Sequence, residues 1–227
     1  MKTPSVTHPP SPRTRQRILT AARQLFAQQG FHGAAVREIA QRAGTNKALI
    51  YYYFRDKDAL YRAVLQDSFL PLLALWEDPA IRTASTAREK LSRFLEGFIQ
   101  FHARNEALRK ILALEITRGG KHLRWVVQRF LSKNYTHLER ILQEGIARGE
   151  FRPLDVRLTA TSCIGLVVFN FVSKPILREM HPGSRIETRA LHRHLMGLVL
   201  EGIASKASGT GASSRSSRRR LPCASGR

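Results

Sequence analysis

Hydrophobic residues recur every three to four positions along most of this chain, which is the spacing of one face of an α-helix. The pattern predicts two short helices between 36 and 54, and further helices over 14–29, 57–70, 91–102, 106–117, 122–147, 156–173 and 184–205. Loops are expected at 78–85 and 174–183, and Pro71 is expected to kink or interrupt its helix. Since no segment shows the two-residue alternation of a strand, the expected fold is all-α.

The segment from 36 to 54 has the pattern of two helices joined by a tight turn. Its first helix places apolar residues at i, i+3, i+4 and i+7, and Gly44 then fits the positive φ at which helices commonly end. Asn46 supplies a side-chain oxygen that can cap the second helix. Ile50 and Phe54, four residues apart, are expected to pack against the first helix. The first helix contributes Val36, Ile39, Ala40 and Ala43.

The outer face of the second helix carries the candidate chemistry. If Ile50 points inward, then Lys47, Tyr51 and Tyr52 point outward, where an ammonium and phenols can contact phosphates, sugars and base edges. A run of tyrosines alone is more often packing than recognition. The capped turn and the two facing apolar stripes favour a helix-turn-helix DNA reader.

At these residues the chain resembles the N-terminal signature of the TetR family of one-component bacterial transcriptional regulators, over about Arg15–Leu65. The resemblance implies that Arg37, on the first helix, contacts a base or phosphate. The chain departs from the family at Ala34 and Ala35, where Thr or Ser usually caps the first helix, and at Thr45, which replaces an aliphatic residue. The implied DNA-binding residues are Arg37, Thr45, Lys47, Ala48, Leu49, Tyr51, Tyr52, Tyr53 and Lys57, the last two on phosphates.

The same resemblance implies a larger helical domain that encloses a small-molecule effector of unknown identity. In that family, occupancy of this cavity changes the separation of the paired DNA readers. The alternative for each candidate is ordinary core, because any helical domain needs aromatic residues at helical spacing. The candidate lining residues are Phe94, Phe98, Phe101, His102, Leu112, Ile116, Trp125, Phe130 and Phe169. Within this core, Glu115 and His102 are expected to form a polar pair.

Dimerisation is expected because one short reader helix seldom gives enough specificity, so such proteins read two half-sites about a two-fold axis. The last two predicted helices are very apolar and contain glycines that permit close packing. The alternative is that both helices bury these faces within one subunit. The predicted interface residues are Ile164, Val168, Phe171, Leu191, Leu195, Leu198 and Val199.

The charge of the chain supports a nucleic-acid partner without identifying a sequence. The 227 residues carry a formal net charge of +21, which raises affinity for any polyanion. The expected organisation is a disordered N-terminus (1–12), a DNA-binding domain (13–60), an effector and dimerisation domain (61–204) and a disordered basic tail (205–227). The tail, with six Lys/Arg and no Asp/Glu, either rests on DNA phosphates or only improves solubility.

Other classes of protein find little support in the sequence. The chain has no apolar run of about 20 residues and no signal-peptide pattern, so a cytoplasmic protein without membrane contact is expected. Its two cysteines allow no disulfide framework or cysteine zinc site, and Cys163 is expected to be a small buried hydrophobe. No catalytic, metal or cofactor motif is present, so neither an enzyme nor a cofactor is expected.

These patterns together predict a homodimeric repressor that binds a palindromic double-stranded operator and is released by its effector. One alternative is an activator or global regulator with the same reader. Another is a basic architectural protein that binds DNA without sequence preference.

Overall fold

The computed structural model describes residues 11–118, 120–183 and 187–204; the predicted disorder of 1–10 and of the basic tail lies outside these ranges. In the described part of the chain the only β-type pairing is an isolated bridge between Phe151 and Ala204. The all-α prediction is therefore confirmed. The helices are α1 (Pro12–Gly33), α2 (Val36–Arg42), α3 (Lys47–Tyr53), α4 (Lys57–Ala74), α5 (Pro79–Arg82), α6 (Ala87–Arg104), α7 (Glu106–Thr117), α8 (Leu123–Val126), α9 (Ser132–Ala147), α10 (Val156–Val172), α11 (Lys174–Met180) and α12 (Thr188–Ile203), with a 3₁₀ turn at Leu75–Glu77 and a π turn at Val127–Leu131.

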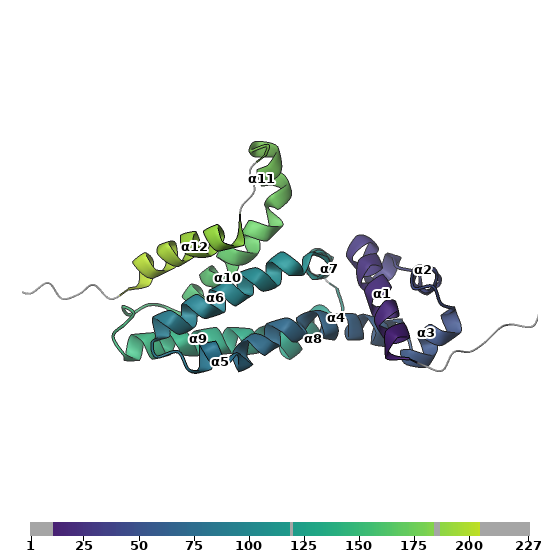
Figure 1. The fold of residues 1–227 in the computed structure, drawn as a ribbon, viewed down its shortest axis with the longest axis horizontal. Helices are drawn as coiled ribbons and strands as arrows, with labels where there is room; N and C mark the ends of the chain where they lie inside the picture. The colour runs from purple at the N-terminus through teal and green to yellow at the C-terminus, as the bar shows by residue number, and fades with distance from the viewer. Residues whose placement is uncertain (1–10, 119, 184–186, 205–227) are drawn as a thin grey trace, which may run out of the picture.

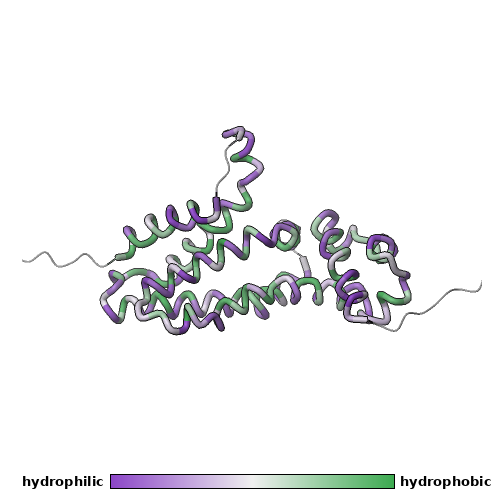
Figure 2. The backbone as a smooth tube through the Cα atoms, viewed as in Figure 1, coloured by the Kyte–Doolittle hydropathy of each residue, from purple (hydrophilic) through white to green (hydrophobic). Residues whose placement is uncertain are grey.

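The first three helices form a module at one end of an elongated molecule, and α4 connects it to the remaining helices (Figure 1). α1 packs against both α4 and α7, so the module is in direct contact with the larger domain. In that domain α6 packs on α9 and α12, and α9 packs on α10. Figure 2 shows hydrophobic and hydrophilic residues interleaved along these helices, as expected for elements with one buried face.

The first helix is longer than predicted. Ser11 caps it by accepting a hydrogen bond from the backbone N–H of Thr14, and Pro12 takes the first-turn position that proline tolerates. Residues 11 and 12 therefore belong to the folded module and not to a disordered N-terminus. Helical geometry is interrupted at Gly30, whose φ of 74° confirms the predicted stop, and one more turn follows it.

Prolines lie at two wrong predictions and in one helix that is longer than predicted. Pro79 and Pro175 lie in the first turns of the short helices α5 and α11, in segments that were predicted to be loops. α4 runs past Pro71 to Ala74, where the buried side chains of Phe69 and Leu72 hold the helix against the core on both sides of the proline. A proline inside a helix is unfavourable by about 3 kcal/mol, which packing of this kind offsets.

The predicted long helix over 122–147 is divided into α8, a π turn and α9.

Cys163 is buried, and burial raises the pKa of its thiol to about 11, as expected for a small core residue. No single described helix is long and apolar enough to cross a bilayer. α10 and α11 meet that criterion only when combined, and they are bent by 58° at the break between them.

Candidate nucleic-acid interface

The turn between α2 and α3 is held by its own backbone and by α1. Gly44 adopts a φ of 58°, and the N–H of Thr45 donates to the carbonyl of Ala40 at 2.9 Å. The guanidinium of Arg17 donates hydrogen bonds to the carbonyl oxygens of Ala43 and Gly44. These carbonyls lie at the C-terminal end of α2, where a positive charge interacts favourably with the helix dipole. The positive φ favours glycine at position 44, and a Cβ there, 2.6 Å from Arg17 Nη2, would displace this guanidinium.

The faces of α3 are assigned as predicted. Asn46 caps the helix by accepting a 2.8 Å hydrogen bond from the N–H of Leu49. Ile50 and Phe54 are buried against Ile39 and Ala40 of α2 in the common core. The predicted geometry of the reader is therefore confirmed.

The outer face of α3 is exposed to solvent. Tyr51 and Tyr52 are 41% and 68% exposed, and Lys47 and Ala48 are exposed beside them. The Lys47 ammonium lies 5.6 Å from the centre of the Tyr51 ring, which is a cation–π distance. Two large aromatic side chains and a cation left in water on one short helix indicate a surface built for contact with an anionic partner.

The remaining predicted contacts divide into two groups. Arg37 is exposed, whereas Thr45 and Leu49 are half-buried at the edge of α3. Tyr53 and Lys57, implied to hold phosphates, are engaged within the module: the Tyr53 hydroxyl donates to the carbonyl of Ser11 at 3.0 Å, and Lys57 Nζ donates to that of His32 at 3.3 Å. Burial also lowers the pKa of Lys57. Their contacts with phosphate stay a prediction.

The start of α2 lacks a side-chain cap. Ala35 occupies the N-cap position with the extended backbone typical of caps, but its methyl group accepts no hydrogen bond. Ala34 is fully buried and ends α1 through a bond from its N–H to the carbonyl of Gly30. The structure therefore confirms that α2 lacks the side-chain cap, as the sequence indicated.

A polar cluster joins the reader module to the larger domain, and the sequence pattern did not reveal it. Tyr61, Glu115 and His122 are buried, whereas Asp58 and Lys121 reach solvent. Glu115 on α7 accepts a 2.7 Å hydrogen bond from the Tyr61 hydroxyl on α4 and lies 3.5 Å from His122 Nδ1. His122 Nε2 and Lys121 Nζ each lie 2.7 Å from a carboxylate oxygen of Asp58, and the Lys121 hydrogen bond lowers the pKa of Asp58. The expected pair of Glu115 with His102 is therefore wrong, because Glu115 faces α4.

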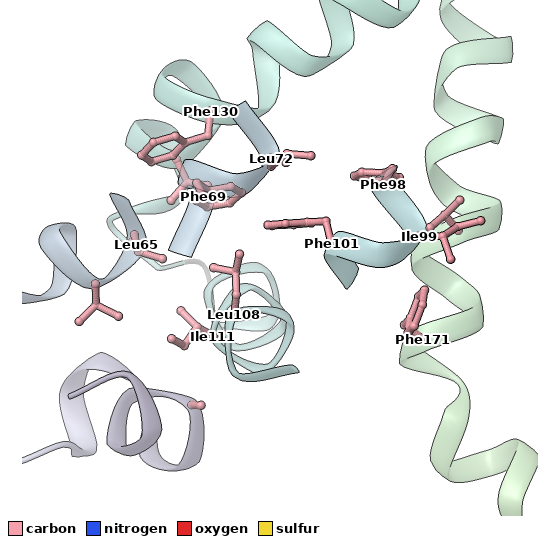
Figure 3. Close-up of a cluster of buried hydrophobic side chains, with 14 of the residues drawn as sticks. Leu65, Phe69, Leu72, Phe98, Ile99, Phe101, Leu108, Ile111, Phe130 and Phe171 are labelled. Carbon is pink, nitrogen blue, oxygen red and sulfur yellow. The ribbon is translucent and has the colours of Figure 1, made fainter. Parts of the chain in front are cut away.

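The predicted effector-pocket residues are mostly packed core. Phe94, Phe98, Phe101 and Phe130 are buried, and Figure 3 shows Phe101 pointing toward Phe69 with Phe171 on the other side of the cluster. Phe69 stacks on Phe130 with ring centres 4.5 Å apart.

His102 is also buried, and the remaining four members lie nearer the surface. Leu112 and Trp125 are half-buried, whereas Ile116 and Phe169 are 64% and 67% exposed and therefore line no enclosed cavity, which corrects that prediction. An open groove of about 560 Å³ lies between α6 and α12 and touches none of the nine.

The predicted dimer residues also divide by burial. Phe171, Leu191, Leu195 and Val199 are buried within one subunit, so for them the alternative of an intramolecular core holds; Ile164 and Val168 are half-buried. Only Leu198 is exposed. A different set of large apolar side chains on α10 and α11 faces solvent with it: Leu158, Leu166, Phe169, Val172, Ile176 and Met180.

Comparison with known proteins agrees with this architecture. The family model for bacterial regulatory proteins of the tetR family matches residues 18–64, and the model for the tetracyclin repressor-like C-terminal domain matches residues 88–199. The fatty acid metabolism regulator protein of Bacillus subtilis is 26% identical over 83% of this chain and 95% of its own length. The HTH-type transcriptional repressor NicS of Pseudomonas putida is 33% identical over 62% of this chain and 66% of its own.

Solved structures lead to the same family. The regulator FadR from Bacillus subtilis in complex with stearoyl-CoA aligns with a TM-score of 0.68 and 26% identity, over 83% of this chain and 98% of that one. The ketosteroid regulator KstR2 of Mycobacterium tuberculosis shares the fold, with a TM-score of 0.69 and 23% identity over 87% of this chain and 98% of its own. These relatives are transcriptional regulators. The chain therefore belongs to the TetR family of DNA-binding transcriptional regulators, with an N-terminal helix-turn-helix and a C-terminal helical domain.

Proposed function

We propose that this protein is a homodimeric repressor that binds a palindromic operator and is released from it by a small-molecule effector. The observation that carries the proposal is the exposed face of α3, where Lys47, Tyr51 and Tyr52 stand on a helix whose opposite face is buried. A helix of this kind enters the major groove with its first residues at base edges. Because the target is chromosomal DNA, we place the protein in the bacterial cytoplasm.

Dimerisation is supported by the apolar face on α10, α11 and Leu198 of α12. Its exposed members recur at helical spacing along α10, and α11 has no buried residue within one subunit. A soluble monomer seldom leaves so many large apolar side chains of neighbouring helices in water. A second copy related by a two-fold axis would cover this face and set two α3 helices against successive half-sites.

An apolar effector is supported by the interior of the larger domain and by the relatives. The domain is rich in buried phenylalanines on α6 and around it. FadR was solved with stearoyl-CoA, and a relative along most of the chain is a fatty acid metabolism regulator. We infer that the effector of this protein has an apolar body that enters the same part of the fold, and that its binding alters the distance between the two readers.

The high net charge favours one competing function, a basic protein that binds DNA without sequence preference. Footprinting on duplexes selected from a random pool separates the two. A short protected palindrome supports the regulator, whereas diffuse protection on any sequence supports the alternative. A reporter fused to a promoter carrying the selected site then distinguishes repression from activation, which share the same reader.

A further inference from the structure

Three nitrogen-bearing side chains from three different helices gather around one aromatic ring in the larger domain. The ring is that of Phe171 on α10. Lys174 Nζ on α11 lies 4.5 Å from its centre, and the guanidinium carbon of Arg109 on α7 lies 5.1 Å from it. The imidazole of His102 on α6 stacks on the same ring with centres 5.9 Å apart.

Two of these side chains have buried polar atoms without partners. His102 is only 6% exposed, and its Nδ1 has no hydrogen-bond partner among the described residues. Arg109 Nη1 is likewise buried and unpartnered. A buried polar atom that lacks a partner is unfavourable by about 1–3 kcal/mol, more when it is charged. Two such side chains against the same Phe171 ring indicate a group that the described residues do not supply.

Positive charge predominates around this ring among the described residues. Desolvation lowers the pKa of Lys174, and the charges of Arg109 and Arg178 lower it further, against a smaller opposing effect of Glu106. Burial, with a contribution from Arg109, lowers the pKa of His102 to about 4. Glu106, whose carboxylate raises the pKa of Lys174, is exposed and paired with Lys110 at 2.8 Å.

We propose that Arg109, Lys174 and His102 form a binding subsite for the anionic head group of the effector. The proposal rests on the proposed function, because it assumes that this domain binds an effector. Arg109 Nη1 and His102, in its Nδ1–H tautomer, donate to the anion, and Lys174 completes the neutralisation. The Phe171 ring forms one wall of this subsite.

The residues beside His102 indicate the chemistry of the rest of the ligand. Phe98 lies against His102 with ring centres 4.5 Å apart, and Phe101 lies at 5.3 Å from it; both rings continue into the core of Figure 3. An apolar body extending from the anion past His102 therefore meets aromatic side chains. The ligand class is an amphipathic anion, with either a carboxylate or a phosphate as its head group.

Isothermal titration at constant ionic strength tests the subsite with three probes that share one body: octanoate, octyl phosphate and 1-octanol. We expect at least one anion to bind the wild-type protein tenfold or more tightly than the alcohol, since a charge-assisted hydrogen bond contributes more than a factor of ten. Arg109→Gln should remove that difference. The exposed Arg129, in the same domain and without an ion pair among the described residues, provides the control Arg129→Gln, which should leave it unchanged.

Each result decides the question. The stronger of the two anions identifies the head group as carboxylate or phosphate. If 1-octanol binds as well as both anions, if none of the three binds, or if Arg109→Gln retains the preference, the proposal is overturned. Should Arg109→Gln fail to fold, Lys174→Gln tests the same subsite at a half-buried position, with Arg109→Lys as the rescue variant.

Two parallel measurements separate this proposal from the proposed function. Binding of the unliganded protein to the selected duplex tests the regulator alone, and its failure would leave the anion preference measurable. Light scattering on Arg109→Gln tests whether the cations instead meet acidic groups of a second copy. A monomeric variant with unchanged anion binding would assign the cluster to the dimer and overturn the subsite.

Discussion

The Tyr61 hydroxyl on α4 donates a 2.7 Å hydrogen bond to Glu115 Oε1 on α7, across the junction between the reader module and the larger domain. Both residues are buried, and burial with this bond raises the pKa of the phenol well above its ordinary range. Gly120 accommodates the carboxylate, since a Cβ there would lie 1.9 Å from Glu115 Oε2. A movement of α7 would therefore be transmitted through this hydrogen bond to α4, the helix that follows the reader.

Removing this bond should destabilise the protein. Tyr61→Phe leaves a buried carboxylate without its donor, and we expect the free energy of unfolding to fall by about 1–3 kcal/mol. Urea denaturation measures the change. Tyr135→Phe is the matched control, because the Tyr135 hydroxyl bonds only to Thr161 at an exposed site and its loss should change stability by less than about 0.5 kcal/mol. Equal effects of the two substitutions would show that the junction does not depend on this bond.

Substitutions on the outer face of α3 should weaken DNA binding without unfolding the protein. Lys47→Ala and Tyr51→Ala are each expected to lower affinity for the selected operator by about 1–3 kcal/mol while the melting temperature stays at the wild-type value. Ile50→Asp, on the inner face, should instead unfold the module by burying an unpaired charge. Unchanged operator binding by both outer-face variants would reject α3 as the reader.

The sequence predicted the reader well because its determinants are local. A glycine stop, an asparagine cap and apolar residues three and four positions apart define two short helices without reference to the rest of the chain. Pro79 and Pro175 misled the prediction because proline both ends helices and begins them, and only the packing around each one distinguishes the two cases.

Contacts between distant segments were not predictable. Tyr61 and Glu115 are 54 positions apart, and helical spacing gives the buried face of each helix but not the partner opposite it. α10 is apolar around most of its circumference, so its pattern could not separate the face that packs on α9 from the face in solvent. The predicted interface consequently mixed buried residues such as Leu195 with the exposed Leu198.

This difference in burial gives a direct test of the dimer. Leu198→Arg and Phe169→Arg change exposed residues, so each should yield a folded monomer that no longer binds the palindrome tightly. Leu195→Arg should instead unfold the larger domain, because the charge would be buried within the subunit. Light scattering and circular dichroism measure assembly and folding together. Dimers formed by both exposed-site variants would place the interface elsewhere.

The uncapped start of α2 offers a stabilising substitution. Ser at position 35 would accept a hydrogen bond from the N–H groups of the first turn, and the extended backbone of Ala35 suits it. We expect Ala35→Ser to raise the free energy of unfolding by about 1 kcal/mol. Ala34→Ser is the adjacent control and should be destabilising, because that methyl group is fully buried. A decrease in stability for Ala35→Ser would show that another group already satisfies these N–H donors.

Stability should depend on pH through His102. Burial, and secondly Arg109, lowers its pKa to about 4 in the folded protein, against an ordinary value near 6.5 in the unfolded chain. Between these pKa values the unfolded chain binds a proton that the folded protein does not. The stability that the protein has with His102 neutral is therefore fully present above about pH 6.5 and is lost as the pH falls toward 4. From pH 7 to pH 5 the loss amounts to about 2 kcal/mol.

Urea denaturation of wild-type protein and His102→Gln at pH 7, 6 and 5, without added anions, measures this contribution as the difference between their pH profiles. The wild type should lose about 2 kcal/mol more than the variant between pH 7 and pH 5, since glutamine does not titrate. His194→Gln removes an exposed imidazole from α12 and should reproduce the wild-type profile. Parallel profiles for wild type and His102→Gln would mean that His102 binds its proton equally well in the folded protein, which its burial beside Arg109 opposes.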